Sequence, residues 1–183
     1  RMLDFSKNYF ELFGLPVGFV LDGRELASRF RELQRVVHPD RYANASDHER
    51  RLSMQAATRI NEAFQVLKEP ISRGRYLLSL HGIDIDSETD NTTDAAFLMQ
   101  QMELREELES ARSQADPHQA LGDLMARITA SQKRLTGQLA LQLEAASSEQ
   151  LDLARESLRK MQFLQKLRDQ AEQLEAELDE QAL

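Results

Sequence analysis

The sequence predicts an all-α protein of two domains, an antiparallel helical hairpin with short flanking helices followed by a three-helix bundle. Apolar residues recur at spacings of three and four along seven segments, the period of amphipathic helices, and no segment alternates as a strand would. Only 7 glycines and 4 prolines occur in 183 residues. The net charge changes sign after Gly82, from +3 over residues 1–82 (13 Lys and Arg, 10 Asp and Glu) to −11 over residues 83–183 (10 and 21), which favours two domains with different partners.

Two short helices are expected to flank the hairpin in the first domain, residues 1–82. One lies in residues 8–16, where aromatic and leucine side chains precede a glycine and a proline, the residues that commonly end helices. The other runs through residues 72–82 and ends at Gly82.

The hairpin is predicted from two long amphipathic helices. Asp22 caps residues 23–37, and Pro39 ends that helix because proline disfavours helical geometry at the residue before it. Ser46, with Glu49 three residues later, forms a capping-box pattern that opens the second long helix. The apolar stripes consist of Leu26, Phe30, Leu33 and Val37 in the first helix, and of Leu52, Ala56, Ile60, Phe64 and Leu67 in the second.

The second domain, residues 95–183, is predicted to follow a linker at residues 83–94, which contain four aspartates and no apolar run. Three amphipathic segments fit this domain, at about residues 94–114, 117–144 and 147–181. Because their connections are short, we predict an antiparallel three-helix bundle.

The composition excludes several kinds of site. The chain has no cysteine, so it forms no disulfide or thiolate metal site, and we expect a reducing compartment, the cytoplasm. No run approaches the roughly 18 apolar residues of a membrane span, so no membrane association is expected. The four histidines show no i, i+4 pairing, and the acidic linker lacks the glycine and closing glutamate of a calcium loop. We therefore predict no metal site and no cofactor.

The tetrapeptide His-Pro-Asp-Arg at residues 38–41 stands between the two long helices. No activated nucleophile or glycine-rich oxyanion site lies near it in the sequence, so we predict no catalytic residue and no enzyme activity. The residues alone leave two roles open, a turn that stops a helix or a contact surface for another protein. A stripe containing Arg24, Arg31 and Arg35 leads along the preceding helix to this turn. A nucleic-acid partner is not expected, because the domain carries only +3 and the rest of the chain is acidic.

A short aromatic helix, two long helices and His-Pro-Asp at their junction together resemble the J-domain of DnaJ-type co-chaperones. The segments NYFELFGLP, RELQRVVHPDR, INEAFQVLKEPISRGRYLLSLHG and DAAFLMQQMELREEL are more specifically similar to HscB, the J-protein of bacterial iron–sulfur cluster assembly, over essentially the whole chain. The resemblance implies that residues 1–82 form a J-domain and stimulate ATP hydrolysis by an HscA-type chaperone of the DnaK class. The residues that it implies for chaperone binding are His38, Pro39, Asp40, Arg24, Arg31, Arg35 and Arg41.

The helix expected at about residues 94–114 has two apolar faces. At about 100° per residue, one side holds the core stripe Phe97, Leu104, Leu108 and Ala111. The other side holds Leu98, Met99 and Met102, with Glu103 and Glu106 beside them. A bundle helix should bury one face, so the second face either binds a partner or packs against the first domain.

In HscB-like proteins this helix recruits the IscU-type scaffold on which the cluster is built. The resemblance therefore implies a scaffold-binding surface made of Leu98, Met99, Met102, Glu103, Glu106 and Phe163. Phe163 lies off the main stripe of its own helix, and an alternative role for it is that of a core aromatic.

Two rival functions remain open. One is a helical adaptor or dimeric coiled-coil protein without ATPase-stimulating activity, and the other is a metal-dependent hydrolase. A coiled coil would use the last helix, although the three-residue spacings of Met161, Leu164 and Leu167 break a strict heptad.

Overall fold

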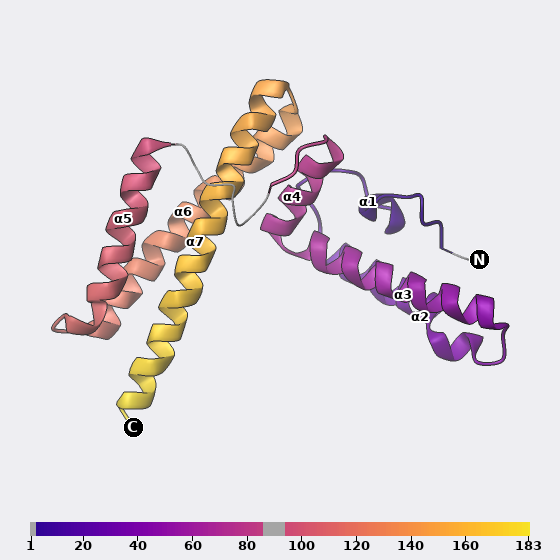
Figure 1. Cartoon of the computed structure of the whole chain (residues 1–183), viewed down its shortest axis with the longest axis horizontal. Coiled ribbons are helices and arrows are strands. Elements are labelled where there is room, and N and C mark those ends of the chain that lie inside the picture. Colours follow the sequence, from indigo (N-terminus) through magenta and orange to yellow (C-terminus); the bar gives the residue numbers. More distant parts are fainter. Residues whose placement is uncertain (1–2, 86–93) are drawn as a thin grey trace. The chain divides into compact units, whose positions relative to one another are not determined.

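The computed structural model describes residues 3–85 and 94–183, and every regular element in these ranges is a helix (Figure 1). This confirms the predicted all-α fold class. The chain divides into two compact units, Arg1–Gly82 and Ile83–Leu183. Most of the linker predicted at residues 83–94 lies outside the described residues. None of the helices in the described ranges combines the length and apolar character needed to cross a membrane.

The N-terminal unit is built on a helical hairpin. Helices α2 (Gly23–Val37) and α3 (Asp47–Lys68) lie antiparallel and side by side, and α1 (Tyr9–Leu12) and α4 (Pro70–Leu80) pack on α3 (Figure 1). The core between them holds the predicted apolar stripes and residues from the short helices. Its fully buried large side chains are Phe10, Leu26, Ile60, Leu67 and Leu78.

The predicted stripes are buried to different degrees along the hairpin. Leu26 and Val37 are buried, whereas Phe30 and Leu33 of the same stripe are half-buried. Phe30 stacks on Phe64 of α3 with ring centroids 4.0 Å apart. The two helices therefore pack partly through an aromatic pair at the margin of the core.

Helix α1 is shorter than the segment predicted at residues 8–16. Asn8 and Glu11 form a capping box that fixes its start. It ends before Gly14, whose φ of +63° is a conformation that favours glycine. Arg29 of α2 donates hydrogen bonds of 2.9 Å to the Phe13 carbonyl and 3.2 Å to the Gly14 carbonyl. A Cβ at Gly14 would lie 2.6 Å from Arg29 Nη1, so any other residue here would also have to displace the end of the Arg29 side chain.

Helix α4 begins at Pro70, two residues before the predicted start. Proline is accommodated there because the first turn of a helix needs no backbone donor. The buried Arg73 on this helix donates a 2.8 Å hydrogen bond to the Leu67 carbonyl, and its guanidinium carbon lies 4.8 Å from the centroid of the Phe19 ring. Burial lowers the pKa of Arg73 from its ordinary value, and the charge of Glu69 opposes that shift. One side chain thus satisfies the end of α3 and joins it to the segment before α2.

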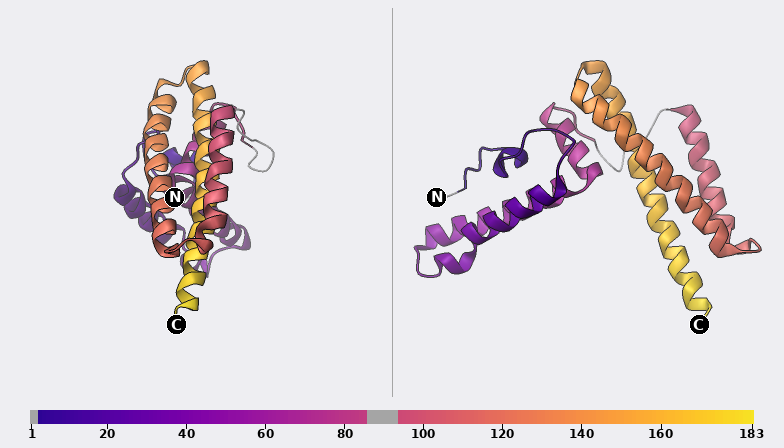
Figure 2. Two further views of the ribbon diagram at one scale, coloured as in Figure 1. Left: turned by 90° about the vertical axis from the view of Figure 1, so that its left-hand side faces the viewer. Right: turned by 180° about the vertical axis from the view of Figure 1, so that it is seen from behind.

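The C-terminal unit is a three-helix bundle. Helices α6 (Pro117–Ala145) and α7 (Ser148–Gln181) form a long antiparallel pair, and α5 (Ala95–Ser110) packs against both (Figures 1 and 2). The helix predicted to reach residue 114 ends earlier, and a 3-10 turn, η2 (Ala111–Ser113), follows it. Ala146, with φ 52°, makes the tight turn between the long helices.

The apolar stripe of α7 is buried within this bundle. Leu158, Leu164 and Leu167 are at most 1% exposed, as are Leu124 and Leu139 of α6. A dimeric coiled coil would need the same stripe for a second chain. The fold therefore disfavours that use of the last helix.

Candidate functional site

The His-Pro-Asp segment forms the turn between α2 and the next helix. His38 has φ −56° and ψ 130°, so α2 ends at Val37, as expected for a residue before proline. One of the two predicted roles was a turn that stops the helix, and in this turn Pro39–Tyr42 forms a short 3-10 helix, η1. Pro39 occupies its first position, where the missing backbone donor costs no hydrogen bond.

The side chain of His38 caps this 3-10 helix. Its Nδ1 accepts a 3.2 Å hydrogen bond from the backbone N–H of Asp40, so in the neutral ring the proton resides on Nε2. The Asp40 carboxylate lies 3.6 Å from the same Nδ1 and is 92% exposed. An accepting Nδ1 has no proton for that carboxylate. The turn therefore offers a partner both a ring N–H donor and an exposed carboxylate acceptor.

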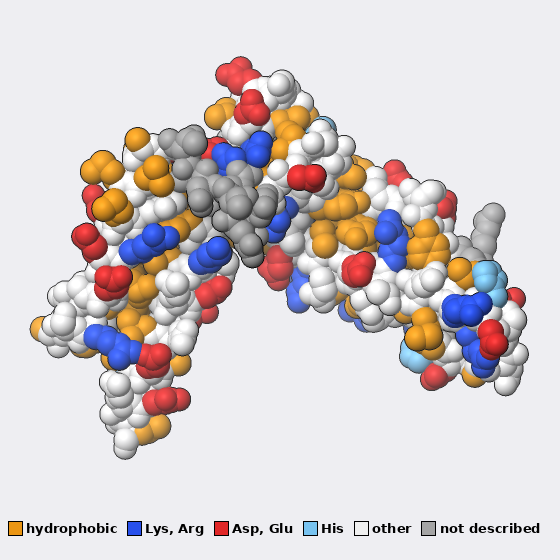
Figure 3. All heavy atoms as spheres, viewed as in Figure 1, with side chains coloured by type: hydrophobic (Ala, Val, Ile, Leu, Met, Phe, Trp, Pro, Cys, Tyr) orange, Lys and Arg blue, Asp and Glu red, His pale blue; other side chains and the backbone are white. Residues whose placement is uncertain are grey.

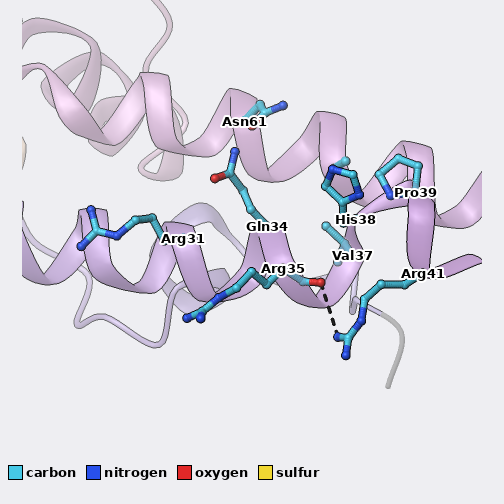
Figure 4. Close-up of a pocket in the computed structure, with 9 residues that line it drawn as sticks. Arg31, Gln34, Arg35, Val37, His38, Pro39, Arg41 and Asn61 are labelled. Carbon is cyan, nitrogen blue, oxygen red and sulfur yellow. Dashed lines mark hydrogen bonds between the residues drawn. The ribbon is translucent and has the colours of Figure 1, made fainter.

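A groove of about 1050 Å³ runs from this turn along the seam between α2 and α3. Figure 4 shows arginine side chains from α2 and from the turn around it. The predicted residues that line it are Arg31, Arg35, His38, Pro39 and Arg41, and the remaining lining residues are Gln34, Val37, Ala57 and Asn61. Five of the seven residues expected to bind a chaperone thus share one surface.

Two expected residues lie away from the groove lining. Arg24 is exposed in the first turn of α2, at the opposite end of that helix from Pro39. Asp40 is exposed on η1. Arg41, in contrast, turns back from η1, and its Nη1 donates a 3.4 Å hydrogen bond to the Arg35 carbonyl (Figure 4). This bond places a cation at the C-terminal end of α2, where the helix dipole stabilises positive charge.

Ser53 of α3 anchors the turn through a hydrogen bond to the end of α2. Its Oγ donates a 2.7 Å hydrogen bond to the carbonyl of Val37, the last residue of α2, and the side chain is 1% exposed. A carbonyl at a helix end has no intrahelical partner, so this bond satisfies a buried acceptor and ties α3 to the start of the His-Pro-Asp turn.

Replacing Ser53 with alanine should destabilise the N-terminal unit by about 1–3 kcal/mol, because the Val37 carbonyl is left buried without a donor. All three tyrosines, Tyr9, Tyr42 and Tyr76, lie in residues 1–82 and the chain has no tryptophan, so tyrosine fluorescence during urea unfolding reports this unit alone. Ser28→Ala on the exposed face of α2 is the matched control. Equal unfolding midpoints for the two variants would contradict the anchoring role.

A second candidate surface lies on α5. Leu98, Met99 and Met102 are 41%, 65% and 63% exposed, and Glu103 and Glu106 beside them are also exposed. In Figure 3, hydrophobic atoms gather over the upper part of this helix, with acidic side chains beside them. Methionine side chains adapt to irregular surfaces, so the composition suits protein binding.

Phe163 of α7 joins this surface only in part. It is half-buried and meets the buried Phe97 of α5 edge to face, with ring centroids 5.8 Å apart. The Arg105 guanidinium carbon also lies 5.1 Å from the Phe163 ring centroid. Phe163 therefore packs between α5 and α7, at a seam formed by Phe97 and Phe163, and also lies next to the exposed face of α5.

Comparison with known proteins shows the family to which the chain belongs. A family model described as the HSCB C-terminal oligomerisation domain matches residues 93–172. A co-chaperone protein HscB homolog from Vibrio cholerae is 48% identical over 171 residues, covering 93% of this chain and 98% of the relative. The chain belongs to the HscB co-chaperone family. The homolog from Aliivibrio fischeri is 49% identical over the same shares of the two chains.

Solved HscB structures share the fold. The structure of chaperone HscB from Vibrio cholerae has a TM-score of 0.84 and 45% identity, covering 94% of this chain and 99% of that chain. The crystal structure of human co-chaperone HscB has a TM-score of 0.86 and 31% identity, covering 96% and 85%. The family expected from the sequence is therefore confirmed, and the HscB architecture covers nearly all of this chain.

Several residues at these surfaces were missed in the sequence. Gln34 and Asn61 complete the groove from opposite helices, Ser53 supports the turn, and Arg105 covers Phe163. Gln34 lies between Arg31 and Arg35, so the arginine spacing could have indicated it. The sequence gives no signal that places the other three, because their contacts join separate helices.

Proposed function

We propose that this HscB-family protein recruits an IscU-type iron–sulfur scaffold and stimulates the ATPase of an HscA-type, DnaK-class chaperone in the cytoplasm. The observation that carries the proposal is the groove beside the His-Pro-Asp turn, where Arg31, Arg35 and Arg41 line the same surface as the exposed His38 and Pro39. Such a surface suits an acidic protein partner.

Docking would proceed through complementary charge followed by specific hydrogen bonds. The arginines accelerate encounter with an acidic chaperone surface and orient the hairpin on it. His38 Nε2 then donates and the Asp40 carboxylate accepts at the turn, which Pro39 stiffens. A hydrogen bond to a charged group contributes about 1.5–3 kcal/mol, so the loss of one such bond would be enough to abolish a weak regulatory contact.

The groups that cleave ATP would belong to the chaperone, and this chain would contribute binding and positioning without a cofactor of its own. The α5 surface would hold the scaffold through Leu98, Met99 and Met102, with Glu103 and Glu106 at its acidic edge and Phe163 at the seam with α7. Carrying both partners on one chain raises the effective concentration of the scaffold at the chaperone.

Single-turnover ATP hydrolysis by an HscA-type chaperone tests this function. We expect the chain to accelerate hydrolysis, and to accelerate it further when scaffold is present. Raising the salt concentration should slow docking, because exposed arginines act over a screening length of about 8 Å at physiological ionic strength. A chain that binds scaffold without accelerating hydrolysis would be a helical adaptor. Acceleration that is insensitive to salt would argue against the arginines.

A further inference from the structure

Arg105 occupies the same face of α5 as the exposed apolar residues, but it differs from them in charge. At about 100° per residue and with Phe97 at zero, Arg105 lies at about 80°, Leu98 at about 100° and Met102 at about 140°. Glu106 and Glu103 follow at about 180° and 240°. The apolar surface thus has a cationic edge towards α7 and an acidic edge on its other side.

Arg105 lies beside the aromatic contact between α5 and α7. Phe97 and Phe163 meet edge to face, and each ring has a cation near it. The Lys160 nitrogen is 5.5 Å from the Phe97 centroid, and the Arg105 guanidinium carbon is 5.1 Å from that of Phe163. A cation near an aromatic ring is attracted by the ring quadrupole, which favours this position of the Arg105 guanidinium.

The two cations differ in what neutralises them. Lys160 forms a 2.9 Å ion pair with Asp94, the residue that caps α5, and this hydrogen bond holds the pKa of the Asp94 carboxyl below its usual value. Within residues 3–85 and 94–183, Arg105 has no ion-pair partner, although it is exposed. An aromatic ring offers no hydrogen-bond acceptor matched to the forked guanidinium, so its N–H groups remain available to a carboxylate.

We propose that Arg105 is a specificity-determining residue of the α5 surface, which binds a carboxylate on the scaffold segment that covers Leu98 and Met102. This inference rests on the proposed scaffold-binding function. The acidic edge at Glu103 and Glu106 would meet a basic side chain of the same segment. The surface therefore selects an apolar segment with a carboxylate on the α7 side and a cation on the other, which fixes the orientation in which the segment binds.

Arg105→Gln, Arg105→Glu and Arg105→Lys test the inference with a purified, fluorescently labelled IscU-type scaffold titrated at several salt concentrations. Arg105→Gln should weaken binding about 3- to 10-fold and reduce its salt dependence, because one charge pair is lost. Arg105→Glu should weaken binding about 10- to 100-fold by adding repulsion. Arg105→Lys should keep the wild-type salt dependence. Arg134→Gln, which removes an exposed arginine of α6, is the matched control and should behave as wild type.

The outcomes separate this inference from the proposed function. If the wild type fails to bind scaffold, the proposed function itself is wrong. If the wild type binds and Leu98→Ala/Met102→Ala weakens binding, but Arg105→Gln and Arg105→Glu leave both affinity and salt dependence unchanged, only the role of Arg105 is overturned. Weaker binding of Arg105→Gln with unchanged salt dependence, together with an equal loss in Arg105→Lys, would assign Arg105 to packing on Phe163 and also overturn it.

Discussion

Replacing His38 with glutamine should abolish the stimulation of ATP hydrolysis by an HscA-type chaperone while leaving the chain folded and able to bind scaffold. The His38 side chain is 57% exposed, so little core packing depends on it. Its loss removes both the cap on the Asp40 N–H and the outward Nε2 donor. A lost hydrogen bond to a charged group corresponds to about 10- to 150-fold in affinity. In single-turnover assays at subsaturating concentrations, we therefore expect a rate within about 2-fold of the unstimulated chaperone.

His48→Gln is the matched control for this variant, because His48 is an exposed histidine on α3 that does not line the groove. It should stimulate hydrolysis as the wild type does. Tyrosine fluorescence and scaffold titration establish that His38→Gln remains folded and binds its other partner. Full stimulation by a folded His38→Gln protein would rule out the proposed role of the turn.

Leu98→Ala/Met102→Ala should weaken scaffold binding by about 10-fold or more, because it removes two exposed apolar side chains that anchor the proposed interface. Neither residue belongs to the bundle core, so helical content and thermal stability should stay close to those of the wild type. Stimulation of the chaperone in the absence of scaffold should also be unchanged. Phe163 is better tested separately, since its contact with Phe97 makes Phe163→Ala a change in packing as well as in surface.

Leu141→Ala/Leu153→Ala is a closely matched control. These leucines are 69% and 46% exposed and lie in α6 and α7. Scaffold titrations by calorimetry should separate the two double variants. Because the matched family model is described as an oligomerisation domain, sedimentation of each variant provides a further measurement. Unchanged scaffold affinity with altered self-association would identify the α5 face as a contact between copies of this chain.

The positions and most of the ends of the helices could be predicted from local sequence pattern. Apolar spacing and capping residues such as Asp22 and Ser46 act within one or two turns, and both cap their helices in the structure. The same locality fixed the end of α2, since Pro39 restricts the residue directly before it. The boundaries that differed, at the end of α1, the start of α4 and the end of α5, involve about one turn of helix or less, for which flanking packing outweighs weak local preference.

The candidate groove depended on more than local pattern. The arginine spacing on α2 predicted a shared face, but Arg24 lies too far along that helix to join Arg31 and Arg35 at the groove. Arg41 reaches it only because η1 turns its side chain back to the Arg35 carbonyl. The direction of a side chain after a turn depends on the turn conformation, which the tetrapeptide alone did not specify.

By itself the sequence determined the all-α class, the amphipathic faces and the HscB family, because periodicity, caps and motifs are properties of neighbouring residues. Only the tertiary structure decided which side chains from different helices meet. In the folded chain Ser53 donates a hydrogen bond to the Val37 carbonyl, Asn61 and Gln34 line the same groove from two helices, and the Arg105 guanidinium lies near the Phe163 ring. These contacts depend on how one helix is rotated and shifted against another, and that arrangement is set by the packing of the whole core.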